Sequence, residues 1–423
     1  MARVMKDSRV KWIGEIPEEW KTQKLKFCTT FVQEKYDESS EEDLTYIGLE
    51  NIVSWNGKRV ETESQYDKNQ SILFRQGDIL WGKLRPYLAK VFHAQNDGCC
   101  SGEFCVIRIN KGNSERYFWN LLISSEFVST VDRSTYGTKM PRANADFIRN
   151  VVVPIPPLEE QTLIANFLDA ECARIDAVIE QTRASIEEYK KLKQAVITQA
   201  VTKGIRPNRP MKDSGIEWVG EIPEEWEVRR IKTLFRLRDE KNYLPLEEVN
   251  LISLYTDKGV VQHCDLEQTT GNKATSADGY KKVYENDIVV NIILCWMGAI
   301  GRSAYTGVTS PAYDIYVPSD EIESRFYHHY FRTKGFSGDC YKRGKGIMAM
   351  RWRTYSDQFR DISVVVPPIE EQREILDYLD AKTTEIDKLI AKKEMFLAEL
   401  ETYKKSMIYE YVTGKREAMS KHE

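Results

Sequence analysis

The chain has 423 residues, of which 30% are charged and 41% are hydrophobic, and its formal net charge is −4. This length exceeds a single small module and allows two or three domains, each with its own core. The balance of charged and apolar residues is typical of a folded globular protein and excludes a disordered one. The negative net charge argues against binding nucleic acid over the whole surface, because phosphate neutralisation requires a local excess of Lys and Arg.

The N-terminal residues contain no apolar signal segment, and the most apolar stretch, residues 288–301, is short and includes Asn291. Neither export nor membrane insertion is indicated, so we expect a cytoplasmic protein. The eight cysteines then predict buried thiols in a reducing compartment. Cys99, Cys100 and Cys105 cluster, but adjacent cysteines chelate poorly and no second Cys/His pair lies nearby, which favours thiols over a metal site.

The first element in chain order is a segment that recurs in the second half. Residues 5–20 read MKDSRVKWIGEIPEEW and residues 211–226 read MKDSGIEWVGEIPEEW, and the two are identical at 12 of 16 positions. We call them the EIPEEW segments. A long internal repeat determines the architecture, so we expect one structural frame that is built twice.

The residues after the first EIPEEW segment predict a mixed α/β domain. Runs of β-branched and aromatic residues at 44–52, 71–80 and 104–109 are typical of strands, and residues 117–131 are expected to be helical. Basic side chains crowd a Gly- and Pro-broken segment and a later polar turn, and such loops can project donors toward phosphates and bases. The candidates for DNA contact are Lys83, Arg85, Tyr87, Lys90, Lys139 and Arg142, each of which could equally be a solvated surface residue.

After Pro157 the spacing of apolar residues changes to the period of a helix. We expect Pro157 in the first turn of this helix and the acidic pair at residues 159–160 near the positive end of the helix dipole. Lys203 and Gly204 mark the stop. The helix would cover about 45 residues, or ~68 Å. Its apolar stripe for helix packing consists of Ile164, Leu168, Ile175, Ile179, Ile186 and Tyr189.

Residues 206–210, with two prolines, are the expected linker between the two halves of the chain. A second mixed α/β domain follows the second EIPEEW segment. We expect its strands at residues 249–255, 287–294 and 312–317 and a helix at residues 321–334. Residues 340–353 contain no Asp or Glu and predict a basic face. The second set of DNA-contact candidates is Arg302, Tyr313, Lys342, Arg343, Lys345, Arg351 and Arg353.

Three aromatic residues of this domain, Trp296, Tyr313 and Trp352, could touch bases, although core packing is the favoured interpretation. The adjacent His328 and His329 have no Cys or carboxylate at ligand spacing, so we interpret them as a pair on a helix face.

A second helix repeats the first one 211 residues further on. Residues 156–170 read PPLEEQTLIANFLDA and residues 367–381 read PPIEEQREILDYLDA, identical at nine of 15 positions, with Pro368 in the place of Pro157 and Gly414-Lys415 as the stop. The second stripe is Ile375, Leu379, Ile386, Ile390, Leu397 and Leu400. Long helices with narrow stripes need a partner, so we expect an antiparallel coiled coil of the two copies. The alternative is a pair of long core helices in an ordinary domain.

The chain resembles the specificity (S) subunit of type I restriction-modification enzymes, in which two different domains alternate with two repeated helices. The resemblance rests on PPLEEQ and PPIEEQ, which open the two helices, and on WIGEIPEEW and WVGEIPEEW, which precede the two domains. The stretches at residues 77–92, 136–157 and 296–318 also resemble the scaffold of such domains. The resemblance covers essentially the whole chain.

This resemblance implies an α+β fold with two target-recognition domains, each reading one half of a split, asymmetric sequence in double-stranded DNA. The helices would set the spacing and dock two modification subunits, which carry S-adenosylmethionine and methylate adenine; whether restriction subunits join is left open. The chain itself would have no catalytic residues and no cofactor. The expected boundaries are 1–157 for the first domain, 158–204 for the central helix, 205–226 for the linker and second EIPEEW segment, 227–366 for the second domain, 367–417 for the C-terminal helix and 418–423 for a tail.

Two rival classes remain at this point. A solitary methyltransferase or nuclease would need its own site, but the sequence contains no Asn-Pro-Pro-aromatic or Asp-Pro-Pro-Tyr tetrapeptide, no Gly-rich cofactor turn after a strand and no convincing nuclease cluster. A coiled-coil scaffold that binds only protein would show no sequence-specific DNA footprint.

Overall fold

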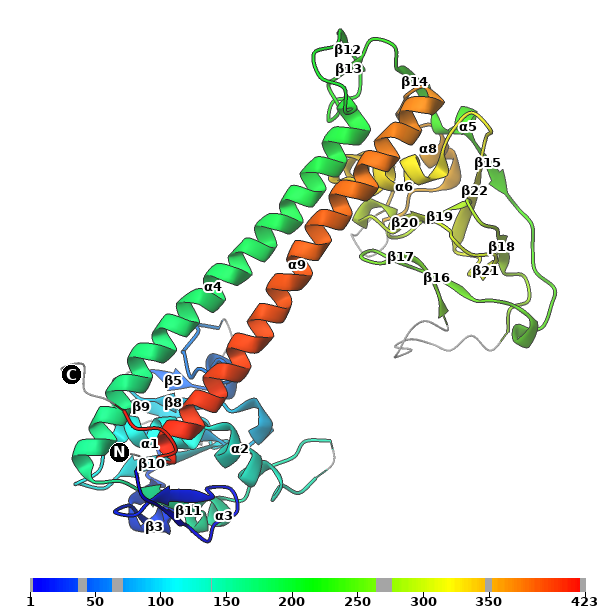
Figure 1. Cartoon of the computed structure of the whole chain (residues 1–423). Coiled ribbons are helices and arrows are strands. Elements are labelled where there is room, and N and C mark those ends of the chain that lie inside the picture. The colour runs from blue at the N-terminus through cyan, green and yellow to red at the C-terminus, as the bar shows by residue number, and fades with distance from the viewer. Residues whose placement is uncertain are drawn as a thin grey trace. The chain divides into compact units, whose positions relative to one another are not determined.

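The computed structural model describes residues 3–36, 44–62, 71–137, 139–263, 276–346 and 352–418. The chain divides into two compact units: unit 1 comprises Met1–Arg183 with Glu394–Glu423, and unit 2 comprises Ala184–Lys393. Each unit contains one of the two different domains that the repeat encloses, which we call the variable domains (residues 21–155 and 227–366). Each unit also contains portions of the two long helices α4 (Leu158–Lys203) and α9 (Ile369–Val412), which Figure 1 labels.

The variable domain of unit 1 is built on a four-stranded antiparallel sheet. Its strand order is β4 (Thr29–Val32), β10 (Phe104–Ile109), β7 (Ile79–Gly82) and β8 (Val91–His93). A smaller sheet contains β5 (Tyr46–Ile47), β9 (Gly98–Cys100) and β6 (Ile72–Phe74). Helices α1 (Glu115–Ile123) and α2 (Ser125–Asp132) contribute Tyr117, Phe118 and Phe127 to the core.

The variable domain of unit 2 repeats this main sheet in the same order. The strands are β15 (Phe235–Arg238), β22 (Tyr313–Pro318), β19 (Ile288–Asn291) and β20 (Ile300–Arg302), and the helices are α6 (Ser324–Phe331) and α7 (Lys334–Arg343). The smaller sheets differ from unit 1: β16 (Ile252–Tyr255) pairs with β17 (Gly259–Gln262), and β18 (Lys281–Val283) pairs with β21 (Gly307–Thr309).

The strands that enter and leave each variable domain pair with each other. In unit 1, β3 (Lys21–Lys24) pairs with β11 (Val152–Ile155), and in unit 2, β14 (Glu227–Arg230) pairs with β23 (Ser363–Val366). Each EIPEEW segment forms a hairpin, β1 (Met5–Asp7) with β2 (Glu15–Pro17) and β12 (Met211–Asp213) with β13 (Glu221–Pro223). The short helices are α3 (Ala145–Asn150), α5 (Ile231–Leu234), α8 (Ser356–Arg360), η1 (Leu25–Phe27), η2 (Leu49–Asn51), η3 (Pro86–Leu88), η4 (Leu246–Glu248) and η6 (Cys295–Met297).

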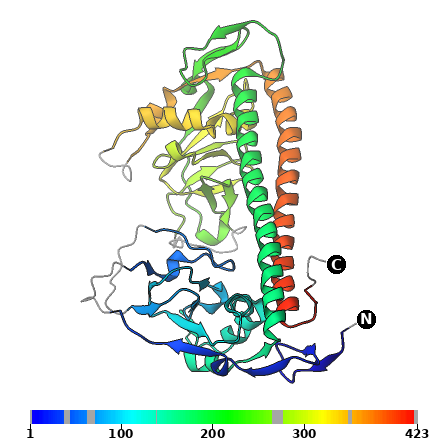
Figure 2. The ribbon, with the colours of Figure 1, turned by 90° about the vertical axis from the view of Figure 1, so that its left-hand side faces the viewer.

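The long helices contain 46 and 44 residues and lie side by side, as both Figure 1 and Figure 2 show. Their ion pairs establish that they run antiparallel. In unit 1, Lys404 Nζ lies 2.6 Å from Asp176, and in unit 2, Lys193 Nζ lies 2.6 Å from Asp387. Because equivalent helix positions are 211 residues apart, these are the same pair made twice. The predicted fold, two mixed domains with two long paired helices, is confirmed.

The predicted apolar stripes run along both helices with unequal burial. In unit 1, Ile164, Leu168, Ile175 and Ile179 belong to the core, and Leu397 and Leu400 pack against it partly exposed. In unit 2, Ile375 and Leu379 belong to the core, Ile186 and Ile386 are buried, and Tyr189 and Ile390 are partly buried. None of the described helices has both the length and the apolar character of a membrane span.

The expectation that the prolines occupy the first helical turn is wrong by one residue, since α4 begins at Leu158 and α9 at Ile369. The carbonyl oxygen of Pro157 accepts the N–H of Gln161 at 2.9 Å, and Pro368 accepts that of Gln372 at 3.0 Å. Each proline therefore stands in the capping position, whose carbonyl already takes the first helical hydrogen bond.

The second glutamate of each LEEQ or IEEQ motif joins the helix to an EIPEEW segment. In unit 1, the Trp20 indole donates to Glu160 at 2.7 Å, and Arg3 pairs with the same carboxylate at 2.5 Å. In unit 2, Trp226 donates to Glu371 at 2.9 Å and Arg209 pairs with it at 2.6 Å. We call each triad of arginine, tryptophan and glutamate a clasp. The clasps explain why these distant sequence motifs are repeated together.

The C-terminal ends of the long helices are held by the EIPEEW segments in the same way. The ammonium group of Lys203 donates to the carbonyl oxygen of Val219 at 2.8 Å, and that of Lys415 donates to Ile13 at 2.5 Å. Gly204 and Gly414 both have a φ of +73°, which ends each helix. The inverted order of lysine and glycine at the two stops therefore leads to the same contact.

Candidate nucleic-acid interface

Two groups of predicted DNA-contact residues meet in unit 1. The loop after β7, residues 83–89 (the first loop), lies beside residues 136–142 (the first hairpin), of which 138 lies outside the described residues. The N–H of Arg85 donates to Pro141 at 2.8 Å, and that of Ala143 donates to Lys83 at 2.9 Å. We call this loop and hairpin together the first platform. The structure thus brings together residues that are 56 and 60 positions apart in sequence.

The side chains of the first platform differ in their surroundings. Arg85, Tyr87 and Lys139 are exposed, so they are accessible to a ligand. Arg142 is exposed but pairs with Glu103, and its Nε lies 3.1 Å from the carboxylate. Lys83 is partly buried. The ammonium group of Lys90, beyond the loop, donates to the backbone of Leu49 at 2.7 Å, and burial lowers its pKa, which favours a structural role.

Unit 2 contains an equivalent second platform. It consists of residues 292–298 after β19 (the second loop) and the described residues 345, 346, 352 and 353 (the second hairpin). The N–H of Thr354 donates to Ile292 at 2.9 Å, as Ala143 does to Lys83 in unit 1. Lys345 and Arg353 exchange backbone hydrogen bonds of 2.8 and 3.0 Å. The same backbone frame therefore carries a different set of side chains.

The predicted basic run lies on and beside the second hairpin. Arg343, Lys345 and Arg353 are exposed, whereas Lys342 pairs with Glu217 at 2.5 Å. Arg351 lies outside the described residues. The Trp352 ring stacks on Tyr341 with centroids 4.9 Å apart, and Trp296 contacts the same tyrosine at 5.6 Å. The second loop, the second hairpin and α7 are therefore joined by three aromatic rings.

Two other candidates in unit 2 are placed differently. Tyr313 pairs with Asn291 at the end of β19, where the second loop begins, but its side chain is partly buried. Arg302 pairs with Ile288 at the opposite end of β19, and its guanidinium donates to Asn286 at 2.8 Å. The structure therefore brings Tyr313 close to the second platform and leaves Arg302 away from it.

The adjacent histidines of α6 are partly buried, with ring centroids 5.4 Å apart. Burial and nearby positive charge lower the pKa of His328 to about 3, and burial lowers that of His329 to about 4. Nδ1 of His328 accepts the N–H of Arg302 at 3.1 Å, so the fold holds this ring neutral. The geometry agrees with the interpretation of a structural pair on a helix face.

These histidines predict that unit 2 loses stability as the pH falls from 7 to 5. Their folded-state pKa lies below the unfolded value of about 6.5, so the unfolded chain binds protons first and stability declines below that pH. We expect a loss of roughly 1–2 kcal/mol per histidine at pH 5, measured by denaturant unfolding. His328→Gln should reduce this loss, because the variant lacks the buried ring that takes up a proton on unfolding. An equal loss in wild type and His328→Gln would contradict the assignment.

The clustered Cys99, Cys100 and Cys105 of unit 1 are buried. Burial raises the pKa of Cys105 to about 11, so its thiol remains protonated at neutral pH. Among the described residues, no group of three or more His, Cys, Asp or Glu side chains is arranged to hold a metal ion.

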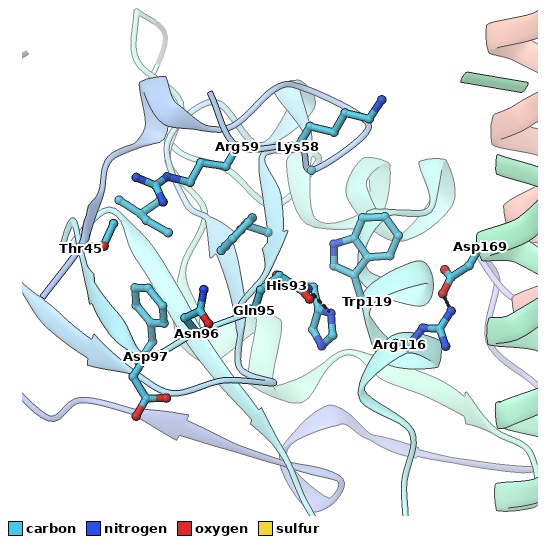
Figure 3. Close-up of a pocket in the computed structure, with 14 residues that line it drawn as sticks. Thr45, Lys58, Arg59, His93, Gln95, Asn96, Asp97, Arg116, Trp119 and Asp169 are labelled. Atoms are coloured by element: carbon cyan, nitrogen blue, oxygen red, sulfur yellow. Dashed lines mark hydrogen bonds and ion pairs between the residues drawn. The ribbon is translucent and has the colours of Figure 1, made fainter. Parts of the chain in front are cut away.

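Sequence reasoning missed a cavity of about 750 Å³ in unit 1, which Figure 3 shows. Its lining includes the basic Lys58, Arg59 and Arg116, the acidic Asp97 and Asp169, and the indole of Trp119. Arg116 forms an ion pair with Asp169 of α4. The acidic side chains therefore offset much of the positive charge. The one sequence signal was the Asn-Gly turn at residues 56–57, followed by two basic residues.

Sequence comparison identifies the class of protein to which these platforms belong. The family described as Type I restriction modification DNA specificity domain matches the chain twice, at residues 17–188 and at residues 223–395. Each match covers one variable domain and more than half of the long helix that follows it, α4 in the first match and α9 in the second. The chain therefore belongs to the type I restriction-modification DNA specificity family.

Several curated relatives are specificity subunits. The MjaVIII subunit of Methanocaldococcus jannaschii is 26% identical over 236 residues, 54% of this chain and 52% of the relative. The EcoDI subunit of Escherichia coli is 23% identical over 199 residues, 46% of this chain and 44% of the relative. The chain thus spans about half the length of these two relatives. The putative MjaX subunit of M. jannaschii is 25% identical over 439 residues, 95% of each chain.

Solved structures share the fold. A chain from a type I restriction-modification system, studied for its complex assembly and conformational transition, aligns with a TM-score of 0.72 at 17% identity and covers 95% of this chain and 99% of its own. The HsdS subunit from Thermoanaerobacter tengcongensis aligns with a TM-score of 0.51 at 19% identity, over 95% and 98% of the two chains. At these identities the likeness supports the fold alone.

Proposed function

We propose that this chain is the specificity subunit of a type I restriction-modification enzyme and that it reads a split, asymmetric target in double-stranded DNA, one half-site per variable domain. The observation that carries the proposal is the repeated platform. The same backbone contacts, Ala143 to Lys83 and Thr354 to Ile292, support two surfaces with different exposed side chains. A frame built twice with two different surfaces suits a target with two different half-sites.

The proposed contacts at the first half-site are made by Arg85, Tyr87 and Lys139, with Lys83 and Arg142 at the margin. At the second half-site they are made by Arg343, Lys345 and Arg353. Arginine and lysine can neutralise phosphates or pair with guanine edges, and tyrosine can contact the DNA backbone. Two weak sites joined in one chain bind a correctly spaced target as a single event.

The long helices are proposed to set the spacing of the half-sites and to dock two modification subunits, which would carry S-adenosylmethionine. The chain itself would act without catalysis and without its own cofactor; restriction subunits are a further candidate partner. The rival enzyme, a solitary methyltransferase, predicts methyl transfer to DNA by the pure chain supplied with S-adenosylmethionine. The rival scaffold predicts no sequence-specific footprint from the reconstituted complex.

The test is to co-express the chain with the modification subunits and to map methylated adenines. We expect one split motif, and a spacer longer by about three base pairs after one heptad is inserted into each helix, after Arg183 and after Lys393. Seven helical residues add ~10 Å and preserve the helical phase, while DNA rises about 3.4 Å per base pair. A seven-residue insertion in the linker at residues 206–210 should leave the spacer unchanged. Altered half-site sequences in the heptad variant, or the absence of a split motif in wild type, would contradict the proposal.

A further inference from the structure

The two loops of the platforms correspond in order along the chain, although the backbone differs at one position, where Arg85 has a φ of +49° and Leu294 a φ of −117°. Each follows the same strand of the main sheet and contains a short 3-10 helix, η3 or η6. The N–H of Leu88 donates to Arg85 and that of Met297 donates to Leu294, both at 2.9 Å. The next residue is left-handed in both loops, with a φ of +46° at Ala89 and +87° at the corresponding glycine. Leu294 therefore occupies the position of Arg85.

The side chains at these equivalent positions have opposite chemistry. The first loop carries two cations, whereas the second loop, residues 292–298, carries no charged side chain. Leu294 is 37% exposed and Met297 is 54% exposed, and both Ile292 and Ile293 are partly exposed. Four apolar side chains of one short loop are thus at least partly exposed, and such a group favours a contact site over chance exposure of single residues.

The surroundings of the second loop indicate which ligand this group meets. The second hairpin is tied to the loop through the hydrogen bond from Thr354 to Ile292, and Trp296 of the loop contacts Tyr341. Exposed Arg343, Lys345 and Arg353 lie on and next to that hairpin. An apolar surface bordered by cations is complementary to DNA, whose phosphates flank base edges. In the major groove, the apolar group of a base edge is the C5-methyl group of thymine.

We propose that the second platform recognises thymine methyl groups through Leu294 and Met297, while the first platform uses the cation Arg85 at the corresponding position. This inference rests on the proposed function, because it assumes that the second platform contacts a half-site. It adds that the two platforms contact bases in different ways: the second through apolar contacts, and the first through hydrogen bonds from a cation.

The experiment uses the full chain in complex with its modification subunits and a labelled duplex that contains the mapped target. Each thymine of the second half-site is replaced in turn by deoxyuridine, which pairs identically but lacks the methyl group. We expect about a fourfold loss of affinity at one or more positions, the value implied by the burial of one methyl-sized group. Because only the DNA is changed in this comparison, protein folding cannot confound it.

Protein variants then connect the effect to the loop. Leu294→Ala or Met297→Ala should abolish the difference between thymine and uracil duplexes at the sensitive position, and the exposure of both side chains makes a folding defect unexpected. Arg85→Ala, the matched variant in the first platform, should preserve that difference. The inference is overturned if no uracil in the second half-site changes affinity, or if both loop variants retain the full difference. Failure of the proposed function would look different, as the unmodified target would bind no better than a scrambled duplex.

Discussion

The double variant Arg343→Ala/Arg353→Ala is expected to weaken DNA binding through the second half-site alone. Both side chains are exposed beside the second hairpin, where they can reach phosphates or guanine edges. Each contact is worth about 1–3 kcal/mol, so the pair should cost at least tenfold in affinity. Binding is measured with the reconstituted complex on duplexes in which one half-site at a time is scrambled. Scrambling the second half-site should no longer matter for the variant, whereas scrambling the first should.

The same measurement can separate phosphate contacts from base contacts. If the arginines neutralise phosphates, the slope of log affinity against log salt should fall by about one for each lost contact. Lys342→Ala is the matched control, because Lys342 lies in the same basic run but pairs with Glu217. Affinity and salt slope that remain at wild-type values in the double variant would remove both arginines from the interface.

Glu371→Ala is expected to destabilise unit 2 by about 3–5 kcal/mol, because it removes the buried charge partner of a largely buried guanidinium. Arg209 then keeps only its ion pair with Glu225, whose side chain is 46% exposed. The side chain of Glu371 is 2% exposed and that of Arg209 is 10% exposed, and the clasp also loses the hydrogen bond from Trp226. Denaturant unfolding measures the loss, and hydrogen exchange in residues 211–226 locates it.

Two matched variants test this interpretation of the clasp. Glu370→Ala changes the neighbouring carboxylate, which is 76% exposed, and should cost well under 1 kcal/mol. Glu160→Ala opens the equivalent clasp of unit 1, where Arg3 and Glu160 are each 20% exposed, and should cost less than Glu371→Ala. A Glu371→Ala protein as stable as Glu370→Ala would show that the clasp contributes little.

The repeated frame was predictable from sequence because its repeated residues are those with specific buried partners. Trp20 and Glu160 are 140 positions apart, yet both recur in the second half and touch each other in the structure. The helices were predictable because a stripe with a 3.6-residue period continues for about 45 residues. Their proline boundaries were misplaced by one residue, since a proline is compatible with both the capping position and the first turn.

The candidate interface was only partly accessible to sequence reasoning. Local crowding of basic residues identified Arg85 and Arg353 as candidates, but it could not distinguish them from Lys90, whose ammonium group donates to the backbone carbonyl of Leu49. That distinction depends on which chain segment packs against each side chain. The apolar second loop was missed for the opposite reason: its sequence is typical of a buried strand end, and only the fold exposes Leu294.

The pairing of β3 with β11 and of β14 with β23 has a consequence for how such a protein changes. Because each variable domain leaves the frame next to where it entered, the chain passes between frame and domain at one place, while the domain core also packs on the long helices. Substitutions or whole exchanges inside a variable domain that keep this packing need not displace the clasp or the helices. Under the proposed function, new sequence preferences could therefore arise in either variable domain while the residues of the clasps and of the long helices stay unaltered.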